Sequence, residues 1–238
     1  MCTVSIIELS GGFRLLTNRD EKRARASAEF PFQWGRAAIG PFDPCGGGTW
    51  VAARPGLTLC LLNFNFKAMP AEPARSISRG RIIPALIDAE DADDAISRLR
   101  TLQMARFVPF RLIAVGRDDR GQVSLCEARW DGEALVRVRH DALPAVFVSS
   151  GLGDEVVGDR VPLFEEMVVQ AGATPQAQDA YHHHRWPNRL HQSVLMSRPD
   201  ARTVSITEVC DTLDGLEMRY SPVDEAGQVT EAVLHAAR

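Results

Sequence analysis

The alternation of apolar and polar side chains at the start of the chain predicts a β-hairpin. One face of a period-two strand holds alternate residues of this segment: Cys2, Val4, Ile6 and Glu8. A Ser-Gly-Gly turn signal follows at residues 10–12, and residues 13–20 form the second predicted strand. The beginning of the chain is therefore expected to fold back on itself.

The register of this hairpin depends on the length of its loop. A three-residue loop with Gly12 in the left-handed conformation sets Cys2 opposite Asp20 and gives matched charged and apolar pairs. A two-residue loop at residues 11–12 sets Cys2 opposite Glu21 and turns the other face of each strand toward its partner. We prefer the three-residue loop, which brings Asp20 beside the amino end.

The remainder of the chain predicts short strands and few helices. A second hairpin spans residues 49–64, where a Pro-Gly turn joins two apolar strands. Later strands are predicted at residues 110–115, 123–129, 134–139, 145–149, 203–210, 216–220 and 228–235. Helices are predicted at residues 78–87, 96–103 and 161–171, and irregular structure at residues 21–36, 39–48 and 174–187. The pattern indicates an antiparallel meander.

Composition and charge exclude several classes of protein. The chain has 238 residues, 45% of them hydrophobic, and we expect one domain over residues 1–238. A formal net charge of -4 argues against a general binder of polyanions such as nucleic acid, although it does not exclude a local basic cleft. No long apolar run predicts a membrane span. The five cysteines are widely spaced and contain no CxxC, so a reducing, cytoplasmic location is expected. The first residues are too short and polar a stretch for a secretory signal.

Two features resemble ligand sites only superficially. Consecutive glycines at residues 46–48 suggest a phosphate loop, but a strand follows them and the Gly-Lys-Ser/Thr signature is absent. The Tyr-His-His-His-Arg-Trp run at residues 181–186 suggests a metal site, but adjacent side chains diverge and no HExxH or paired carboxylate supports them. We therefore predict a solvated loop there, with no metal and no cofactor.

Cys2 is the strongest candidate for chemistry. Removal of the initiator Met before a small residue makes Cys2 the amino terminus, so that one residue carries both a nucleophile and a base. A free α-amine titrates near pH ~8 and a thiol near ~8.5, so the amine can accept the thiol proton close to neutrality. Asp20 can then hold the ammonium. The alternative is a buried, inert cysteine at the start of an edge strand.

Short motifs occur along the chain in a characteristic order. They are Met-Cys-Thr-Val at residues 1–4, Asn-Arg-Asp-Glu at 18–21, Gly-Gly-Thr-Trp at 47–50, Leu-Asn at 62–63, Ser-Arg-Gly at 78–80 and Thr-Val-Ser-Ile-Thr at 203–207. This ordered set resembles the NRDE family, also called the transport and Golgi organisation 2 family. That family is in turn similar to the N-terminal nucleophile hydrolases, especially the choloylglycine hydrolase and penicillin V acylase group.

The resemblance implies an α+β fold, a four-layer αββα sandwich of two mainly antiparallel sheets. It also implies that Cys2 attacks an amide carbonyl and that Asp20 contacts its amine. The sequence departs from the group at two places. Thr17 stands where the group usually has an arginine that contacts the thiol, and Val-Ser-Ser at residues 148–150 occupies the neighbourhood of its oxyanion asparagine.

The predicted function is hydrolysis of a non-peptide C–N amide bond by Cys2, with Asp20 and Asn18 orienting the amine. Four more residues are predicted to bind the small-molecule substrate: Arg19, Asn63, Ser78 and Arg79. The competing prediction is a non-catalytic binding or trafficking protein that uses the same pocket for an apolar ligand. Lipid and haem are the ligands that the eukaryotic members of the resembled family suggest.

Overall fold

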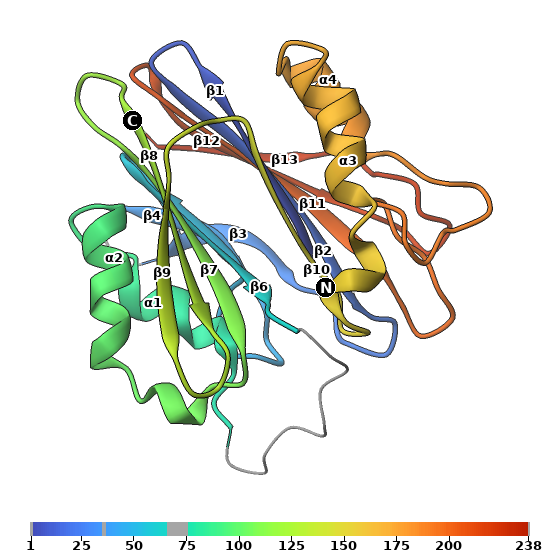
Figure 1. Ribbon diagram of the computed structural model, residues 1–238, viewed down its shortest axis with the longest axis horizontal. Coiled ribbons are helices and arrows are strands. Elements are labelled where there is room, and N and C mark those ends of the chain that lie inside the picture. Colours follow the sequence, from blue (N-terminus) through green and yellow to red (C-terminus); the bar gives the residue numbers. More distant parts are fainter. Residues whose placement is uncertain (1, 35–36, 66–75, 238) are drawn as a thin grey trace.

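Two antiparallel β-sheets pack face to face in the computed structural model, which describes residues 2–34, 37–65 and 76–237 (Figure 1). The six-stranded sheet has the order β10 (Ala145–Ser149), β1 (Cys2–Leu9), β2 (Gly12–Lys22), β11 (Ala201–Thr212), β12 (Gly215–Pro222) and β13 (Val233–Ala237). The seven-stranded sheet has the order β3 (Glu29–Trp34), β4 (Ala38–Phe42), β5 (Val51–Arg54), β6 (Leu57–Asn63), β7 (Phe110–Arg117), β8 (Val123–Trp130) and β9 (Leu135–His140).

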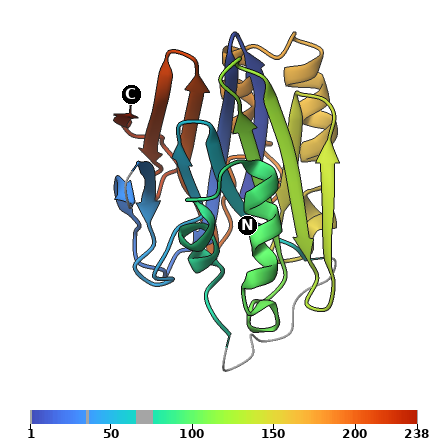
Figure 2. The ribbon, with the colours of Figure 1, turned by 90° about the vertical axis from the view of Figure 1, so that its left-hand side faces the viewer.

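Short helices cover the outer face of each sheet, so that the described chain has four layers. The helices α1 (Ile82–Leu86) and α2 (Ala92–Arg98) pack on the seven-stranded sheet, in front of the strands in Figure 2. The helices α3 (Arg160–Phe164) and α4 (Pro175–His182) pack on the six-stranded sheet. Single helical turns complete the described structure: η1 (Arg79–Arg81), η2 (Leu99–Thr101), η3 (Met104–Arg106), η4 (Asp154–Val157) and η5 (Glu165–Val169). The predicted α+β class with two antiparallel sheets is confirmed.

The hydrophobic core has separate parts between successive layers. Cys2, Val4 and Ile6 point from β1 into the core between the two sheets, as the period-two pattern predicts. Ile7 points the other way and packs under α3 and α4. Burying a side chain such as Ile6 contributes about 1.5–3 kcal/mol, so the alternation fixes which face of β1 meets the other sheet. Within the described ranges, no helix is long and apolar enough to cross a membrane.

A buried carboxylate joins the two sheets at the end away from Cys2. Asp211 of β11 has no exposed surface and accepts a hydrogen bond from the Gly56 N–H, in the turn between β5 and β6, at 2.8 Å. Its other oxygen accepts from Arg117 Nε of β7, also at 2.8 Å. Because a buried carboxylate without partners is costly, these two bonds favour one relative placement of the sheets.

The first hairpin forms, but both predicted registers are wrong. Cys2 pairs with Arg19, not with Asp20 or Glu21, and the loop consists of two residues, Ser10 and Gly11. Successive side chains of a strand point to opposite faces. The one-residue difference therefore puts Arg19 on the same face of the sheet as Cys2 and Asp20 on the other face.

The second glycine of the Ser-Gly-Gly signal, Gly12, belongs to strand β2 and not to the turn. Gly11 has a φ of 73°, which glycine adopts at no steric cost. Gly12 begins β2, and a Cβ there would lie 2.0 Å from the Asp211 carbonyl oxygen of β11. Local pattern alone does not reveal this neighbour, which comes from the far end of the chain, so the loop length was misjudged.

Two segments that were predicted to be irregular contain strands. β3 lies within residues 21–36, and β4 begins at Ala38 and extends into residues 39–48. β3 is an edge strand, where Pro31 removes no hydrogen bond from a central ladder, and its register shifts between Glu29 and Phe32. In β4, a Cβ on Gly40 would lie 2.6 Å from the Val51 carbonyl oxygen, so the glycine permits close pairing with β5.

The polar segment at residues 174–187 contains α4 instead of being irregular throughout. Thr174 caps this helix by accepting a hydrogen bond from the Ala177 N–H at 3.2 Å, and Pro175 occupies the first turn. Threonine followed by proline is a recognised start of a helix. That signal is present in the sequence, whereas the polar composition of the segment does not distinguish a short helix from a loop.

We predict that Gly12→Ala lowers the free energy of unfolding by about 3 kcal/mol, because the new methyl group collides with the β11 backbone. The matched control is Gly158→Ala, where the nearest atom to the new Cβ lies at 3.3 Å and the φ of -56° suits alanine. Urea denaturation of both variants measures the difference. Equal midpoints for the two variants would contradict the register described above.

Candidate active site

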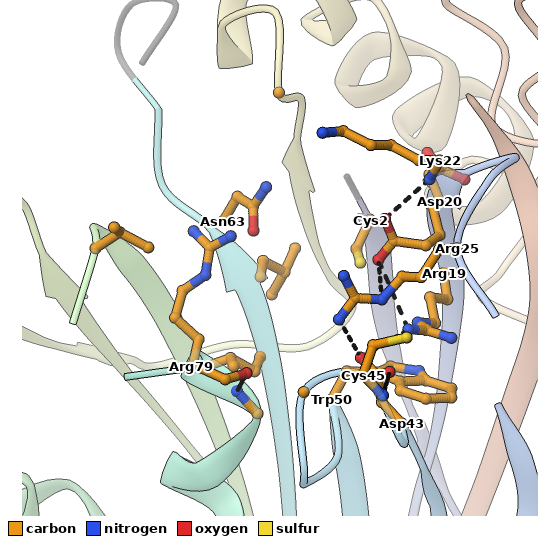
Figure 3. Close-up of a pocket in the computed structure, with 18 of the residues that line it drawn as sticks. Cys2, Arg19, Asp20, Lys22, Arg25, Asp43, Cys45, Trp50, Asn63 and Arg79 are labelled. Atoms are coloured by element: carbon orange, nitrogen blue, oxygen red, sulfur yellow. Dashed lines mark hydrogen bonds and ion pairs between the residues drawn. The ribbon is translucent and has the colours of Figure 1, made fainter. Parts of the chain in front are cut away.

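A pocket of about 870 Å³ lies where β1 begins and where β2 and β6 end (Figure 3). This volume is typical of sites that bind small molecules. The pocket is lined by six of the seven predicted site residues: Cys2, Arg19, Asp20, Asn63, Ser78 and Arg79. The exception is Asn18, whose side chain lies on the far side of the sheet.

Cys2 is held by a strand on each side. It pairs with Arg19 of β2 and with Ser149 of β10, and its backbone N–H donates a hydrogen bond to Ser149 Oγ at 3.2 Å. Only 7% of the residue is exposed. Burial and the negative charge of Asp20 raise the pKa of the Cys2 thiol, whereas a hydrogen bond from the Asp20 backbone and the charge of Arg19 act in the opposite direction. The fold thus buries the thiol and partly offsets the effect of that burial.

Arg19 supplies a positive charge on the thiol side of β2. Its guanidinium lies over the Trp50 ring, 4.2 Å from the centroid, and Nη2 donates to Asp43 Oδ2 at 3.0 Å. Asp43 also accepts from Arg25 Nη2 at 2.7 Å. Although burial opposes it, the hydrogen bond from Arg25 and the charge of Arg19 hold the pKa of Asp43 below its usual value. These contacts fix the guanidinium beside Cys2.

Asp20 points from β2 toward the opposite face. Its Oδ1 accepts a hydrogen bond from Thr203 Oγ1 at 2.6 Å, and its Oδ2 lies 3.6 Å from Arg160 Nη1. Arg160 has no exposed surface and also donates to Thr3 Oγ1 at 2.7 Å. Burial raises the pKa of Asp20, and the charge of Arg160 opposes this rise. Asp20 therefore contributes to the pocket from the face away from the thiol.

The Asn18 side chain is not brought to Cys2. Its Nδ2 donates to the backbone carbonyls of His182 and Val194, both at 2.9 Å, and its Oδ1 lies 2.6 Å from His182 Nδ1. The other ring nitrogen lies 2.7 Å from Ser5 Oγ. Burial lowers the pKa of His182 well below its usual value, so the ring is neutral. This network has no exposed surface and fastens α4 to β1 and β2.

Ser78 and Arg79 reach the pocket through a close contact between two backbones. The Thr49 N–H donates to the Gly80 carbonyl at 2.9 Å, and a Cβ on Gly48 would lie 2.0 Å from that same oxygen. Ser78 Oγ accepts from the Gly80 N–H at 3.3 Å. The consecutive glycines therefore permit the approach of the Ser-Arg-Gly segment, which explains why the two motifs occur together. Figure 3 shows Arg79 and Asn63 across the pocket from Cys2.

The two departures from the hydrolase group have structural counterparts. Thr17 lies two positions before Arg19 and points to the same face of β2, but it carries no charge. Arg19 is therefore the arginine on the thiol side. Residues 148–150, which occupy the neighbourhood of the oxyanion asparagine in that group, lie beside Cys2, because Ser149 pairs with Cys2. The carbonyl of the next residue, Ser150, accepts a hydrogen bond from Asn65 Nδ2 at 3.0 Å.

Sequence reasoning missed three residues that hold the predicted ones in place: Asp43, Arg25 and Arg160. None of them carries a local signal, because each acts on a residue that is distant along the chain.

In the described part of the chain, no group of three or more His, Cys, Asp or Glu side chains is arranged to hold a metal ion. His182 belongs to the buried network, and the neighbouring His183 ring is exposed.

We predict that Asn18→Ala lowers the free energy of unfolding by about 2–4 kcal/mol, because two backbone carbonyls and His182 Nδ1 lose the partner that Asn18 provides. The rate of Cys2 alkylation by iodoacetamide should stay unchanged in the folded variant. Urea denaturation and peptide mass spectrometry provide the two measurements. The control is Asn188→Ala, at an exposed position. A selective loss of Cys2 reactivity with unchanged stability would contradict the structural role.

Comparison with known proteins assigns the chain to a family. The family model described as Transport and Golgi organisation 2 matches residues 1–152, a range that contains β1 to β10 and the Asn-Arg-Asp-Glu segment. No curated protein gives a significant match. The match covers more than half of the chain and includes Cys2 and Ser149, which pair at the pocket. On this basis, the chain belongs to the Transport and Golgi organisation 2 family.

Proposed function

We propose that this protein is an amidohydrolase that cleaves a non-peptide C–N amide bond with Cys2 as its N-terminal nucleophile, in the manner of the N-terminal nucleophile hydrolases. The observation that carries the proposal is the environment of Cys2. The residue lies at the start of β1 in a ligand-sized pocket, with Ser149 at its backbone nitrogen and Arg19 beside its thiol. The four-layer arrangement of helices and sheets is also that expected for such a hydrolase.

The reaction proceeds in two steps. The Cys2 thiol gives its proton to its own α-amine and attacks the amide carbonyl, which forms a tetrahedral oxyanion. Collapse of this intermediate expels the amine of the substrate, which takes the proton from the α-ammonium, and leaves a thioester on Cys2. Water then attacks the thioester with the α-amine as base, releasing the acid and restoring the thiol. Met1 lies outside the described residues, and its removal is required for this chemistry.

Ser149 and Asp20 stabilise different forms of the α-amine. The Cys2 nitrogen lies 3.2 Å from Ser149 Oγ, and in the mature protein this nitrogen is the α-amine. The hydroxyl accepts one of its hydrogens, which leaves the lone pair available to the thiol. Asp20, which follows Arg19 in β2, also lines the pocket, and its negative charge favours the ammonium that forms on proton transfer. The same charge raises the pKa of the thiol. Asn18 acts only indirectly, by holding β2 against α4.

Arg19 and Asn63 complete the proposed machinery. The positive charge of Arg19 favours the thiolate over the thiol and offsets part of the cost of burial. Asn63 lies across the pocket, where its amide can donate to the carbonyl oxygen of the substrate as negative charge develops. Such a donor typically contributes about 10²–10³ in rate. Ser78 and Arg79 form the substrate-binding wall on the same side as Asn63.

A second candidate function is supported by the burial of the nucleophile. Burial raises the pKa of the Cys2 thiol, which reduces the thiolate available near neutral pH. A non-catalytic binding or trafficking protein could use the same pocket for an apolar ligand such as a lipid or haem. The two functions differ in whether a covalent intermediate forms on Cys2.

We predict that Cys2→Ser loses hydrolysis of any acyl p-nitroanilide that the wild-type protein cleaves, because the hydroxyl is a much weaker nucleophile than the thiol. Intact mass spectrometry of acid-quenched wild-type protein should reveal an added acyl group on Cys2. The matched control is Cys45→Ser, which removes the other cysteine that lines the pocket and should keep activity. Equal hydrolysis by wild type and Cys2→Ser would overturn the hydrolase proposal.

We also predict that Arg19→Gln moves the pH profile of Cys2 alkylation by iodoacetamide to higher pH. Loss of the nearby positive charge raises the pKa of the thiol. Arg19→Lys should restore most of the profile because it keeps the charge. The control is Arg25→Gln. It removes the other arginine that donates to Asp43 but keeps Arg19, the residue that pairs with Cys2. Identical profiles for wild type and Arg19→Gln would show that Arg19 does not act on the thiol.

A further inference from the structure

The pocket carries an excess of positive charge that the protein as a whole lacks. Seven of its lining side chains are basic and three are acidic. The whole chain, in contrast, has a formal net charge of -4. Positive charge concentrated in a cleft attracts anions and raises their local concentration. The question is therefore which of these charges are neutralised within the protein.

The acidic residues of the pocket are already paired. Asp43 is bridged by Arg19 and Arg25 at 3.0 and 2.7 Å, and Glu21 lies 3.6 and 3.4 Å from the same two guanidinium groups. Asp20 lies beside Arg160, which is outside the pocket lining. The acidic residues of the pocket therefore neutralise the basic residues near Cys2. No acidic residue of the pocket lining remains to pair with its other basic residues.

Three of the remaining cations form no ion pair in the ranges that the structure describes: Lys22, Arg81 and Arg106. Arg106 makes only a weak contact of 3.3 Å with Gln103, an uncharged partner. Figure 3 shows the Lys22 side chain extending over the pocket from the end of β2. These side chains are exposed to the solvent of the pocket, so a ligand can reach them without breaking an internal salt bridge.

Arg81 and Arg106 belong to one wall of the pocket. The Ile77 N–H donates to the Arg106 carbonyl at 2.9 Å, which joins η3 to the segment that leads into η1. Arg81 lies at the other end of that segment, and a Cβ on Gly47 would be 3.4 Å from its Nη2. The backbones that carry the two arginines are thus held together, and the wall faces the same cavity as Cys2.

We propose that this wall is an anion subsite, in which Arg81 and Arg106 bind a carboxylate or phosphate group of the ligand and Lys22 adds a third positive charge. An uncharged apolar ligand would leave all three charges without a partner of opposite charge among the described residues. Where the amidohydrolase function proposed above operates, the anionic group belongs to the amide substrate, and this part of the inference rests on that function. Anion binding itself does not require Cys2 to react.

The test uses two fluorescent probes with the same ring system. One is 1-anilinonaphthalene-8-sulfonate, which is anionic, and the other is N-phenyl-1-naphthylamine, which lacks the sulfonate. We expect the anionic probe to bind wild-type protein more tightly, and the double variant Arg81→Gln/Arg106→Gln to lower its affinity about tenfold. The affinity of the neutral probe should stay unchanged. Because screening weakens exposed charge interactions, added salt should reduce the difference.

The matched control removes two positive charges elsewhere. Arg120 and Arg219 are exposed and do not line the pocket, so Arg120→Gln/Arg219→Gln should bind both probes as wild type does. Circular dichroism melting curves of both double variants establish that each is folded. Equal affinity of the two probes for wild type, or equal losses in the two double variants, would overturn the proposal.

Competition identifies the class of anion. Displacement of the anionic probe by hexanoate but not by hexanamide assigns a carboxylate, and displacement by inorganic phosphate assigns a phosphate. Displacement by neither anion contradicts the subsite. Because these measurements need no turnover, they separate the subsite from the hydrolase function: a protein that binds anions yet forms no acyl-enzyme keeps the first proposal and loses the second.

Discussion

The pairing of β1 with a strand on each side is the constraint on which the candidate site depends. β2 sets Arg19 opposite Cys2, and β10 sets Ser149 opposite it. One residue of slip in either pair would turn the neighbouring side chains to the other face of the sheet. The register is held at the far end of the hairpin, where Gly12 lies against the backbone of β11. A glycine far from the pocket thus belongs to the same hairpin pairing that sets Arg19 opposite Cys2.

Charge is arranged in two zones around the pocket. Near Cys2, Arg19 is buried and needs partners, and Asp43 and the Trp50 ring provide them. This arrangement lets a positive charge act on the thiol although water is largely excluded. On the facing wall, Arg81 and Arg106 lack acidic partners in the described chain and stay available to a ligand. The first zone serves reactivity, and the second serves binding.

The Asn-Arg-Asp-Glu segment illustrates how one strand can serve several purposes. Asn18 fastens the sheet to α4, Arg19 faces the thiol, and Asp20 is held by Arg160 on the other face. Because consecutive side chains of a strand alternate, a run of four polar residues must divide between the two faces. Only part of such a motif can be close to the reacting atoms.

Alternation and turn residues are local signals, so the sequence predicts the sheet class and most of the strands, although not β3 and β4. The structure places the predicted residues Asn63, Ser78 and Arg79 in the lining of the same pocket as Cys2, and their functional roles stay predictions. Two of the differences between prediction and structure have a common cause. The hairpin register depends on Asp211, and the role of Asn18 depends on His182, 164 residues away along the chain.

Local pattern gives no access to such partners, so the face on which each residue of the segment points was assigned wrongly. Arg160 was missed for the same reason, since only the packing of α3 on the sheet brings it to Asp20. In contrast, α4 was missed although its Thr-Pro start is visible in the sequence. A polar composition is common to loops and exposed helices, so the capping residues are the informative signal at this position.

The central claim is that Cys2 is the amino-terminal residue of the mature protein and reacts through its own amine. Mass spectrometry of the purified protein, with sequencing of its amino-terminal peptide after brief treatment with iodoacetamide, tests this most directly. We predict that Met1 is absent, that Cys2 is the first residue, and that Cys2 is alkylated faster than Cys126 or Cys210. Retention of Met1, or alkylation of Cys2 no faster than of the other two cysteines, would contradict the account.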